Sequence, residues 1–552
     1  MLETPVPLLH PATDARSDAP PAATLAGKPL PRARTTARII LLLAAALFTM
    51  LALSGCSDDK IVFRDRAPFN PPPDAALGFL GYYDAEAKQT TCGNCHVSFQ
   101  GSWAATGHSD AWNTLQASGH AGDSCIGCHT TNGRGNLASG TPAGHDAVAD
   151  EVYYDVQCES CHGPGLEHVE GVGQGQLVRP LARLGMSGEG NCGDCHSGSH
   201  HGFTDEWEQS NHAIVDAGRV SRASCAGCHE GRGALARWGV EANYAEKDTA
   251  DAYQPITCAV CHDPHGSGNP AQLRFPVTST DEEQNLCIKC HLNRAEPNTS
   301  SHGAEPHAPQ GGVLLGFAGW RPPGFAYDTS RIYGSHATTK NPKLCAGCHI
   351  AKFTVTDELT GDFVFNATGH LMRPIPCLDQ DGKPTADNSC AYTTTARTWQ
   401  TCTAAGCHAS DTVAAAAFNT VRARMKFYTD QLWLDSNGDD EIQASPTDGG
   451  ILAMLKATQP NEWSGTDNQI TPAEGAEFNA RLCGEYGQSN TDNSKGTHNP
   501  FLCESLLIAS IQYLNTHYSL TTPSPRMPDW MSGPVGGTFS SSLHVARTPL
   551  DR

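Results

Sequence analysis

The sequence predicts a mainly α-helical protein with extensive irregular structure, whose short helices and loops surround an interior that is not built from aliphatic side chains. Hydrophobic residues make up only 39% of the 552 residues and aromatic residues 7%, which is little for a conventional core. The chain has instead 23 cysteines and 25 histidines. Because its 55 glycines and 36 prolines are scattered and helical periodicity is brief, we expect loops between short helices and little sheet.

Charge and hydropathy exclude two classes of protein. The 37 Lys and Arg residues stand against 58 Asp and Glu residues, for a net charge of -21, whereas a nucleic-acid partner needs clustered positive charge. The mean hydropathy of -0.38 and the lack of an apolar run near 20 residues are not those of a polytopic membrane protein. The sequence therefore predicts a protein that binds no nucleic acid.

The first 55 residues read as an export signal of the lipoprotein type. Arg32, Arg34 and Arg38 precede an apolar run of 15 residues, Ile39–Leu53, which is too short for a spanning helix. The run ends in Leu-Ser-Gly-Cys, which resembles the lipobox of bacterial lipoproteins, so Cys56 would be acylated and become the mature N-terminus. The alternative is a plain export signal. Residues 56–85, with three consecutive prolines at 71–73, are expected to form an extended tether.

The pattern Cys-x-x-Cys-His occurs eight times and is the attachment signature of c-type haem. Two thiols bind the vinyl groups on one porphyrin edge, and the adjacent imidazole then reaches the iron from one face. Zinc is the alternative reading, but zinc does not require a histidine after every second cysteine. The eight motifs are Cys92/Cys95/His96, Cys125/Cys128/His129, Cys158/Cys161/His162, Cys192/Cys195/His196, Cys225/Cys228/His229, Cys258/Cys261/His262, Cys287/Cys290/His291 and Cys345/Cys348/His349.

A ninth site is predicted at Cys402, Cys407 and His408, where four residues instead of two separate the cysteines. It keeps the terminal Cys-His pair and comes next along the chain in the series of motifs, after the eighth. The alternative is a disulfide pair beside an unrelated histidine. Nine haems over residues 92–408 leave too little chain to enclose each one separately, so the haems are expected to contact one another in a closely packed chain.

Four further cysteines of the exported chain are expected to form disulfides in an oxidising compartment. The local pairs Cys377–Cys390 and Cys483–Cys503 close the shortest loops. A longer attachment motif that links Cys390 to Cys407 stays open.

The remaining histidines favour bis-histidine ligation of most irons, because only six methionines follow the signal. Two imidazoles make a six-coordinate iron, which suits electron transport rather than bond-making. The nine candidate ligands on the distal face are His108, His120, His168, His212, His265, His302, His336, His370 and His498.

Residues 92–200 resemble the tetrahaem cytochrome of nitrifying bacteria. The shared features are Trp103 and His108 after the first motif, His120 before the second, and the Gly-Pro-Gly segment that leads to His168 after the third. The resemblance implies that these three histidines are distal ligands, often to a neighbouring haem.

Residues 212–408 resemble the outer-surface and periplasmic cytochromes of metal-respiring bacteria. The segments that carry this resemblance contain His265, His302 and His307, His336, and His370, and His498 before Asn-Pro is similar to a late distal ligand in such proteins. The stretched ninth motif departs from the family pattern.

The motifs predict a tetrahaem module at residues 86–205, a second module with five haems at 206–410, and a helical C-terminal cap at 411–552. Within the cap we expect helices at 411–433, 471–485 and 499–515. The alternate oxygen side chains of Asp435, Asn437, Asp439 and Glu441 suggest a calcium loop, with a solvated acidic turn as the alternative.

These observations predict an electron-transfer lipoprotein with nine haems c that relays electrons across the periplasm or outer membrane, in extracellular or anaerobic respiration. The alternative is a multihaem reductase of nitrite or hydroxylamine, although no Cys-x-x-Cys-Lys motif of that class occurs. The expected partners are redox proteins, such as other cytochromes or an outer-membrane porin-cytochrome complex. A filament or other homo-oligomer stays open.

Overall fold

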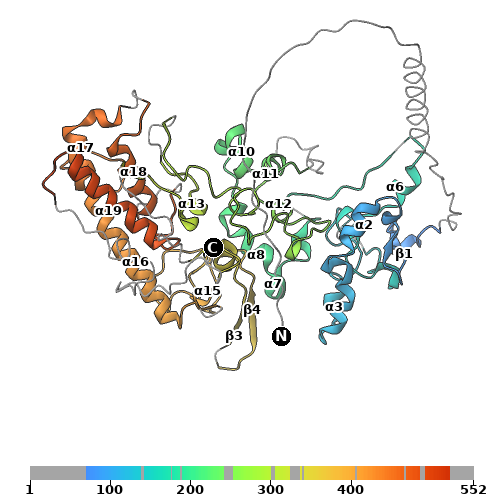
Figure 1. Ribbon diagram of the computed structural model, residues 1–552. Coiled ribbons are helices and arrows are strands. Elements are labelled where there is room, and N and C mark those ends of the chain that lie inside the picture. Colours follow the sequence, from blue (N-terminus) through green and yellow to red (C-terminus); the bar gives the residue numbers. More distant parts are fainter. Residues whose placement is uncertain are drawn as a thin grey trace, which may run out of the picture. The chain divides into compact units, whose positions relative to one another are not determined.

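The computed structural model describes residues 70–522, apart from 139–141, 176, 187–188, 241–252, 300–304, 324–335, 338–340, 358, 405–406, 465–467 and 485–490. Short helices and loops dominate the described chain (Figure 1), which confirms the predicted fold class. No helix among these residues combines the length and apolar character needed to cross a membrane. The predicted signal at residues 1–55 and Cys56 lie outside the described residues.

The first part of the fold, from residue 74 to residue 171, is built from helices of three to seven residues and one small hairpin. Its elements are η1 (Asp74–Ala76), β1 (Tyr82–Asp84), β2 (Gln89–Thr90), η2 (Cys92–Asn94), α2 (Val97–Trp103), η3 (Gly107–Asp110), α3 (Ala111–Ala117), α4 (Asp123–Ile126), η4 (Glu151–Tyr153), α5 (Cys158–His162) and α6 (Leu166–Gly171). β1 and β2 pair antiparallel. Ala76 and Phe79 pack with Tyr153 in a small apolar cluster, so the part of the predicted tether after Pro73 belongs to the fold.

The middle of the chain repeats this construction. Its elements are η5 (Cys192–Asp194), α7 (Gly198–His201), α8 (Phe203–Glu208), η6 (Asn211–Ala213), α9 (Ala217–Val220), α10 (Ala223–His229), α11 (Gly231–Arg237), α12 (Cys258–Cys261), η8 (Pro270–Gln272), α13 (Gln310–Leu315), α14 (Cys345–His349), β3 (Phe353–Thr356), β4 (Phe363–Ala367) and α15 (Gln400–Thr403). β3 and β4 form an antiparallel hairpin in which Phe353 lies opposite Ala367. Most motifs therefore sit on one turn of helix, as expected.

The C-terminal part contains the longest helices and the largest apolar core. The helices are α16 (Asp411–Leu432), α17 (Gly450–Thr458), η11 (Pro460–Trp463), α18 (Pro472–Cys483) and α19 (Pro500–His517), and Figure 1 shows α16 to α19 side by side in orange and red. Thr471 and Glu474 form a capping box at the start of α18. The core buries Met425, Phe478 and Leu507 completely. The predicted helices match α16, α18 and α19, whereas α17 was not predicted.

One of the two predicted disulfides is present. Cys377 and Cys390 are bonded, with their Cα atoms 6.0 Å apart, which confirms that pair and excludes an attachment of Cys390 to Cys407 in this structure. Cys483 on α18 and Cys503 on α19 are both buried and are free thiols in this structure, so the second predicted disulfide is not formed.

Candidate haem-binding sites

We number the sites 1 to 9 in the order of their motifs, from site 1 at Cys92–His96 to site 9 at Cys402–His408. At eight of them a second imidazole ring lies opposite the motif histidine. The ring centres are 6.0 to 6.5 Å apart in every pair. From site 1 to site 8 the pairs are His96–His168, His129–His201, His162–His265, His196–His108, His229–His307, His262–His370, His291–His212 and His349–His498.

This separation fits one metal ion held between two imidazoles. Two metal–nitrogen bonds of about 2 Å, plus about 1 Å from each nitrogen to its ring centre, give about 6 Å. Direct stacking is much closer, as between Trp112 and Tyr154, whose centres are 3.9 Å apart. With two cysteines beside each motif histidine, the residues present therefore fit covalent haem with two axial imidazoles.

The two cysteines of site 1 differ in their exposure to solvent. Cys95 is exposed, whereas Cys92 of the same motif is partly buried. The physical reason is local: Cys95 follows the single turn η2, and the next side chains along the chain, Val97 and Phe99 on α2, are exposed as well. Cys161 of site 3 is exposed too. Cys95 remains a candidate attachment residue, because a thioether bond does not require burial.

In several of these imidazoles the Nδ1 nitrogen forms a hydrogen bond to a backbone carbonyl. The Nδ1 atoms of His129, His162, His262 and His349 donate to the carbonyl oxygens of Ala111, Pro180, Ala271 and Met372, at 2.9, 3.0, 2.7 and 2.8 Å. On the opposite side, the Nδ1 of His168 donates to Val178 at 2.7 Å. A bonded Nδ1 fixes the tautomer and leaves the lone pair of Nε2 for a metal.

A metal ligand must be a neutral imidazole, and burial favours the neutral form at several of the paired histidines. Burial, together with neighbouring imidazoles, lowers the pKa of His212 and His370 to about 4. The pKa values of His196, His336 and His349 also fall to about 4, again mainly through burial.

His498 differs from these ligands because its Nδ1 faces a carboxylate. The Nδ1 atom lies 2.6 Å from Oδ1 of Asp492, whose side chain is 1% exposed. Burial disfavours the charged imidazole, but the Asp492 carboxylate raises the pKa of His498 above its ordinary value. Site 8 is therefore the site where a buried negative charge contacts a candidate ligand.

A tryptophan and a backbone contact position His108 for site 4. The indole of Trp103, at the end of α2, donates to the carbonyl of Val156 at 2.9 Å. The amide of Val156 in turn donates to the carbonyl of His108 at 3.1 Å. These two bonds hold the turn at His108 against the segment that leads into motif 3.

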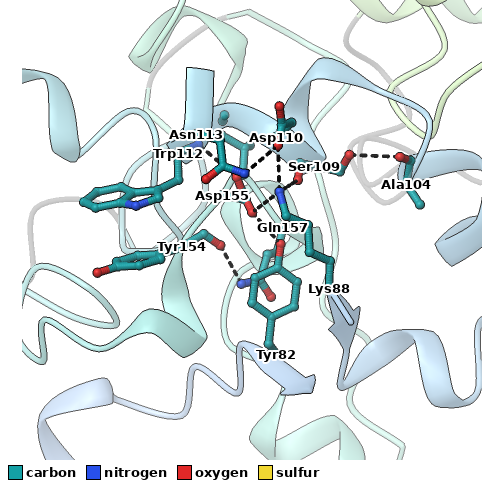
Figure 2. Close-up of polar contacts among 12 residues, drawn as sticks. Tyr82, Lys88, Ala104, Ser109, Asp110, Trp112, Asn113, Tyr154, Asp155 and Gln157 are labelled. Atoms are coloured by element: carbon teal, nitrogen blue, oxygen red, sulfur yellow. Dashed lines mark hydrogen bonds and ion pairs between the residues drawn. The ribbon is translucent and has the colours of Figure 1, made fainter. Parts of the chain in front are cut away.

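An ion cluster around the buried Asp155 holds the next turn of the same segment (Figure 2). Lys88 Nζ lies 2.9 Å from Asp110 and 3.1 Å from Asp155. Asp155, whose side chain is 3% exposed, also accepts hydrogen bonds from the Tyr82 hydroxyl at 2.7 Å and from the Trp112 amide at 2.8 Å. Burial and the Asp155 carboxylate raise the pKa of Tyr82. Because Trp112 follows Ala111, the cluster also fixes the carbonyl that orients His129.

Another buried carboxylate positions His370 for site 6. Glu206 on α8 accepts hydrogen bonds from the amides of Thr368 and His370, both at 2.7 Å. Gly369 between them has a φ of 79°, and a Cβ there would lie 2.5 Å from the backbone of Ile350. The loop that presents His370 thus depends on Glu206 and on a glycine.

Site 9 is the least defined of the nine sites. The amide of His408 donates to the carbonyl of Cys402 at 3.0 Å, so the longer motif still closes into a turn. His336, which is partly buried, interacts electrostatically with His408 and donates from Nδ1 to the carbonyl of Thr497 at 2.7 Å. These contacts place His336 in the neighbourhood of site 9.

The distal candidates from the sequence divide into three groups. His108, His168, His212, His265, His370 and His498 each face a motif histidine, and His336 lies near one. His120 is exposed, and no histidine ring of the described chain faces it. His302 lies outside the described residues.

Two histidines that the structure brings to motif histidines are not among the predicted ligands. His201 faces His129, although it lies only five residues after His196, and His307 faces His229. His307 had been noted in the SSHGAEPH segment, but nothing in its spacing pointed to site 5. His201 lay outside the segments that carried the family resemblances, and its pairing with His129, 72 positions earlier, is a contact between distant parts of the sequence.

The acidic turn of the cap forms bonds within itself. Asp435 accepts from the amides of Gly438 and Asp440, at 2.7 and 3.0 Å, and Asp439 accepts from the amide of Glu441. Among the described residues, no group of three or more His, Cys, Asp or Glu side chains is arranged to hold a metal ion. These contacts agree with the solvated acidic turn.

Two family models match parts of the chain. The model for a doubled CXXCH motif matches residues 253–296, and the model for cytochrome c554 and c-prime matches residues 91–163.

Similar proteins are also multihaem cytochromes. The chain is 29% identical over 201 residues to the C-type polyheme cytochrome OmcB of Geobacter sulfurreducens, which covers 31% of this chain and 25% of that protein. It is 27% identical over 194 residues to the multiheme cytochrome MtrA of Shewanella baltica, which covers 33% of this chain and 55% of that protein. The matches thus span a quarter of one relative and about half of the other.

A solved structure, that of the outer cell wall cytochrome OcwA, is weakly similar. The comparison covers 71% of this chain and 75% of that chain, with 20% identity and a TM-score of 0.39.

Proposed function

Because this chain is a multihaem c-type cytochrome, we propose that it carries nine haems c and relays electrons between redox partner proteins. The observation that carries this proposal is the set of eight imidazole pairs at 6.0 to 6.5 Å. Bound haem would supply a one-electron carrier whose iron has both axial positions filled. The protein holds the two imidazoles in place and shields them from water.

The proposed distal ligands are nine histidines from the described chain. Compared with the set expected from sequence, this set contains His201 and His307 in place of His120 and His302. From site 1 to site 9 the proposed distal ligands are His168, His201, His265, His108, His307, His370, His212, His498 and His336.

Intact mass of the exported, full-length protein tests the haem count. We expect the mass of the mature chain plus nine haems. The C402A/C407A variant is expected to lose one haem, whereas the A404G variant, which changes the same motif but keeps both thiols, is expected to retain all nine. A wild-type mass with eight haems would contradict the ninth site.

The alternative function is reduction of nitrite or hydroxylamine at one iron with an open position, and site 9 is where a second imidazole is least defined. The test is steady-state turnover of each substrate by the fully loaded protein with a reduced viologen as donor. The electron-carrier proposal expects no turnover above that of free haem. Rapid turnover would overturn it.

We also propose that Cys56 is acylated and that the protein faces the periplasm or the cell surface from the outer membrane. The lipobox and the apolar run before it support this proposal. C56S is expected to move the holoprotein from the membrane fraction to the soluble fraction with its haem content unchanged. Retention of C56S in the membrane fraction would contradict lipid anchoring.

A further inference from the structure

The spacing of the motifs divides the haem-binding region into three repeats. The first cysteines of motifs 1, 2 and 3 lie 33 residues apart, at 92, 125 and 158, and the same spacing returns 100 residues later at 192, 225 and 258. Motif 7 at Cys287 begins a third group, whose motifs are more widely spaced. We therefore define repeat 1 as residues 92–191, repeat 2 as residues 192–286 and repeat 3 as residues 287–410.

A segment with the pattern Phe-x3-Trp-x4-His follows the first motif of repeats 1 and 2, and it does not occur in repeat 3. Its phenylalanine and tryptophan lie on α2 in repeat 1 and on α8 in repeat 2. We call it the junction segment. Its residues are Phe99, Trp103 and His108 in repeat 1 and Phe203, Trp207 and His212 in repeat 2.

The tryptophan of each junction segment binds the backbone just before the third motif of its own repeat. The indole of the buried Trp207 donates to the carbonyl of Ile256 at 2.8 Å, and the Ile256 amide donates to the carbonyl of His212 at 3.0 Å. Trp103 is buried as well and takes part in the equivalent two bonds of repeat 1, at 2.9 and 3.1 Å. In both repeats the tryptophan therefore fixes the turn that carries the histidine.

The histidine of each junction segment reaches forward to the next repeat. His108 of repeat 1 faces His196, in the first motif of repeat 2, with ring centres 6.1 Å apart. His212 of repeat 2 faces His291, in the first motif of repeat 3, at 6.2 Å. Repeats 1 and 2 thus each supply the distal candidate for the first site of the repeat that follows, which is site 4 or site 7.

The phenylalanine of each junction segment contacts a histidine that comes back from the next repeat. Phe99 lies against His265 of repeat 2, the distal candidate of site 3, with ring centres 4.6 Å apart. Phe203 lies against His370 of repeat 3, the distal candidate of site 6, at 5.1 Å. The same helix therefore holds a ligand that arrives from the next repeat and precedes a ligand that goes to it.

Backbone packing supports both junctions at one equivalent position, the residue directly before the tryptophan. In repeat 1 this residue is Ser102, and a Cβ on Gly266 of repeat 2, whose φ is 104°, would lie 2.5 Å from its carbonyl oxygen. In repeat 2 it is Glu206, which accepts hydrogen bonds from the amides of Thr368 and His370 of repeat 3. In both cases the loop that returns a histidine packs directly on the junction segment.

The middle site of each repeat adds one more returning histidine. His129 of site 2 faces His201 of repeat 2 at 6.5 Å, and His229 of site 5 faces His307 of repeat 3 at 6.0 Å. Each junction therefore has three facing pairs, in which one histidine passes forward and two pass back. The other two of the eight pairs lie within repeat 1, at site 1, and between repeat 3 and the C-terminal cap, at site 8.

We propose that the haem-binding region is an array of three interlocked repeats, in which the axial histidines of sites 2, 3 and 4 join repeats 1 and 2, and those of sites 5, 6 and 7 join repeats 2 and 3. The proposal rests on the function proposed above, because two histidines join their repeats only where both bind one iron. Trp103 and Trp207 are the positioning residues of the forward ligands. Three repeats with three sites each then take the place of the expected modules with four and five haems.

Substitution of the tryptophans tests the forward histidines. W103F removes the indole N–H that holds the turn of His108, so we expect an altered EPR anisotropy in one low-spin haem while nine haems stay bound. The altered signal is expected to be the one that H108M converts to histidine–methionine ligation. In the same way, W207F is expected to alter the signal that H212M converts.

The matched control for both substitutions is W238F. The buried Nε1 of Trp238 has no hydrogen-bond partner among the described residues, so its loss should leave every haem signal as in the wild type. Wild-type spectra of W103F and W207F, or a change at other sites than 4 and 7, would overturn the positioning role.

Amide exchange tests the junctions themselves. H307G removes the histidine that returns to site 5, and added free imidazole then fills the open position on the iron without joining the repeats. We expect site 5 to regain a low-spin spectrum. The amides of Thr368 and His370, which bind Glu206 across the same junction, are nevertheless expected to exchange with solvent faster than in the wild type.

The matched control for H307G is H498G with imidazole, because His498 joins repeat 3 to the cap and not to repeat 2. The same amides should then exchange as in the wild type. Wild-type exchange in H307G with imidazole, or an equal increase in H498G, would overturn the interlocked array. Nine haems and low-spin spectra in both variants would still support the electron carrier in that case.

Discussion

At the scale of single residues, the hydrogen bond on the second imidazole nitrogen differs between sites. Backbone carbonyls accept from His129, His162, His262 and His349, whereas the carboxylate of Asp492 contacts His498 at 2.6 Å. A negative charge on the far nitrogen makes an imidazole a more basic ligand and favours the ferric iron. Site 8 should therefore have a lower midpoint potential than it would have with a neutral partner.

Replacement of Asp492 tests this effect. D492N keeps a hydrogen-bond acceptor but removes the charge, so we expect one haem to rise by about 60 mV, the equivalent of a tenfold change for a one-electron couple. Spectroelectrochemistry of the loaded protein measures the shift. The exposed D381N is the matched control and should leave all potentials in place. An unchanged titration of D492N would contradict the role assigned to the carboxylate.

A pair of substitutions tests whether His201 rather than His120 is the distal ligand of site 2. H201M is expected to convert one haem from bis-histidine to histidine–methionine ligation, which raises its potential and changes its magnetic spectrum. H120M is expected to leave every haem as in the wild type, because His120 is exposed and faces no described histidine. A spectral change in H120M together with a silent H201M would show that the assignment is reversed.

At the scale of elements, buried carboxylates clamp the loops that carry the ligands. Glu206 binds the loop of His370, Asp155 binds the amide of Trp112, and Glu159 accepts from the amides of Leu80, Gly81 and Gly165. Loops with little apolar surface have few other means of being held, and a carboxylate that accepts several amide hydrogen bonds is rigid. The haem-binding region is therefore held by buried carboxylates that accept hydrogen bonds from backbone amides, whereas the C-terminal part is held by apolar packing.

The clamp on His370 gives a prediction. In E206Q the side-chain amide turns N–H groups toward backbone N–H donors, so at least one buried donor loses its acceptor, at a cost of about 1 to 3 kcal/mol. We expect lower thermal stability and a perturbed EPR signal from site 6. The control E208Q lies on the same helix at an exposed position and should change neither. If E206Q and E208Q behave alike, Glu206 does not position His370.

At the scale of the whole molecule, the interior has two kinds of construction. The largest apolar cluster lies mainly in the four helices after Asp411, while the haem-binding region has only small clusters such as Ala76, Phe79 and Tyr153. The composition predicted this deficit of aliphatic core. Stability of the C-terminal part should then respond to apolar truncation in the ordinary way.

Truncation of Leu507 tests the packing of this cap. The side chain is fully buried on α19, so L507A is expected to reduce the free energy of unfolding by about 2 to 5 kcal/mol while the haem spectra stay unchanged. Chemical denaturation followed by far-ultraviolet circular dichroism measures the difference. L359A, at a position that is 96% exposed, is the control and should cost little. A small effect of L507A would mean that α19 is not part of a close-packed core.

Much of this organisation could be predicted from the sequence, and what was missed has physical reasons. Fold class, α16, α18, α19 and the Cys377–Cys390 disulfide follow from local signals such as caps, periodicity and short loops. α17 is only nine residues long, too short for periodicity to stand out. The pairing of His201 with His129 is a tertiary contact that no local pattern encodes. In contrast, the return of Trp103 and His108 as Trp207 and His212, 104 residues later, was visible in the sequence.

We propose that every iron is held between two histidines, so that the protein carries electrons and does not bind substrate at iron. Spin-quantified EPR of the fully oxidised, haem-complete protein tests this proposal most directly. We expect nine low-spin ferric centres per chain and no high-spin signal. A high-spin ferric centre in a sample whose mass shows full haem occupancy would contradict it.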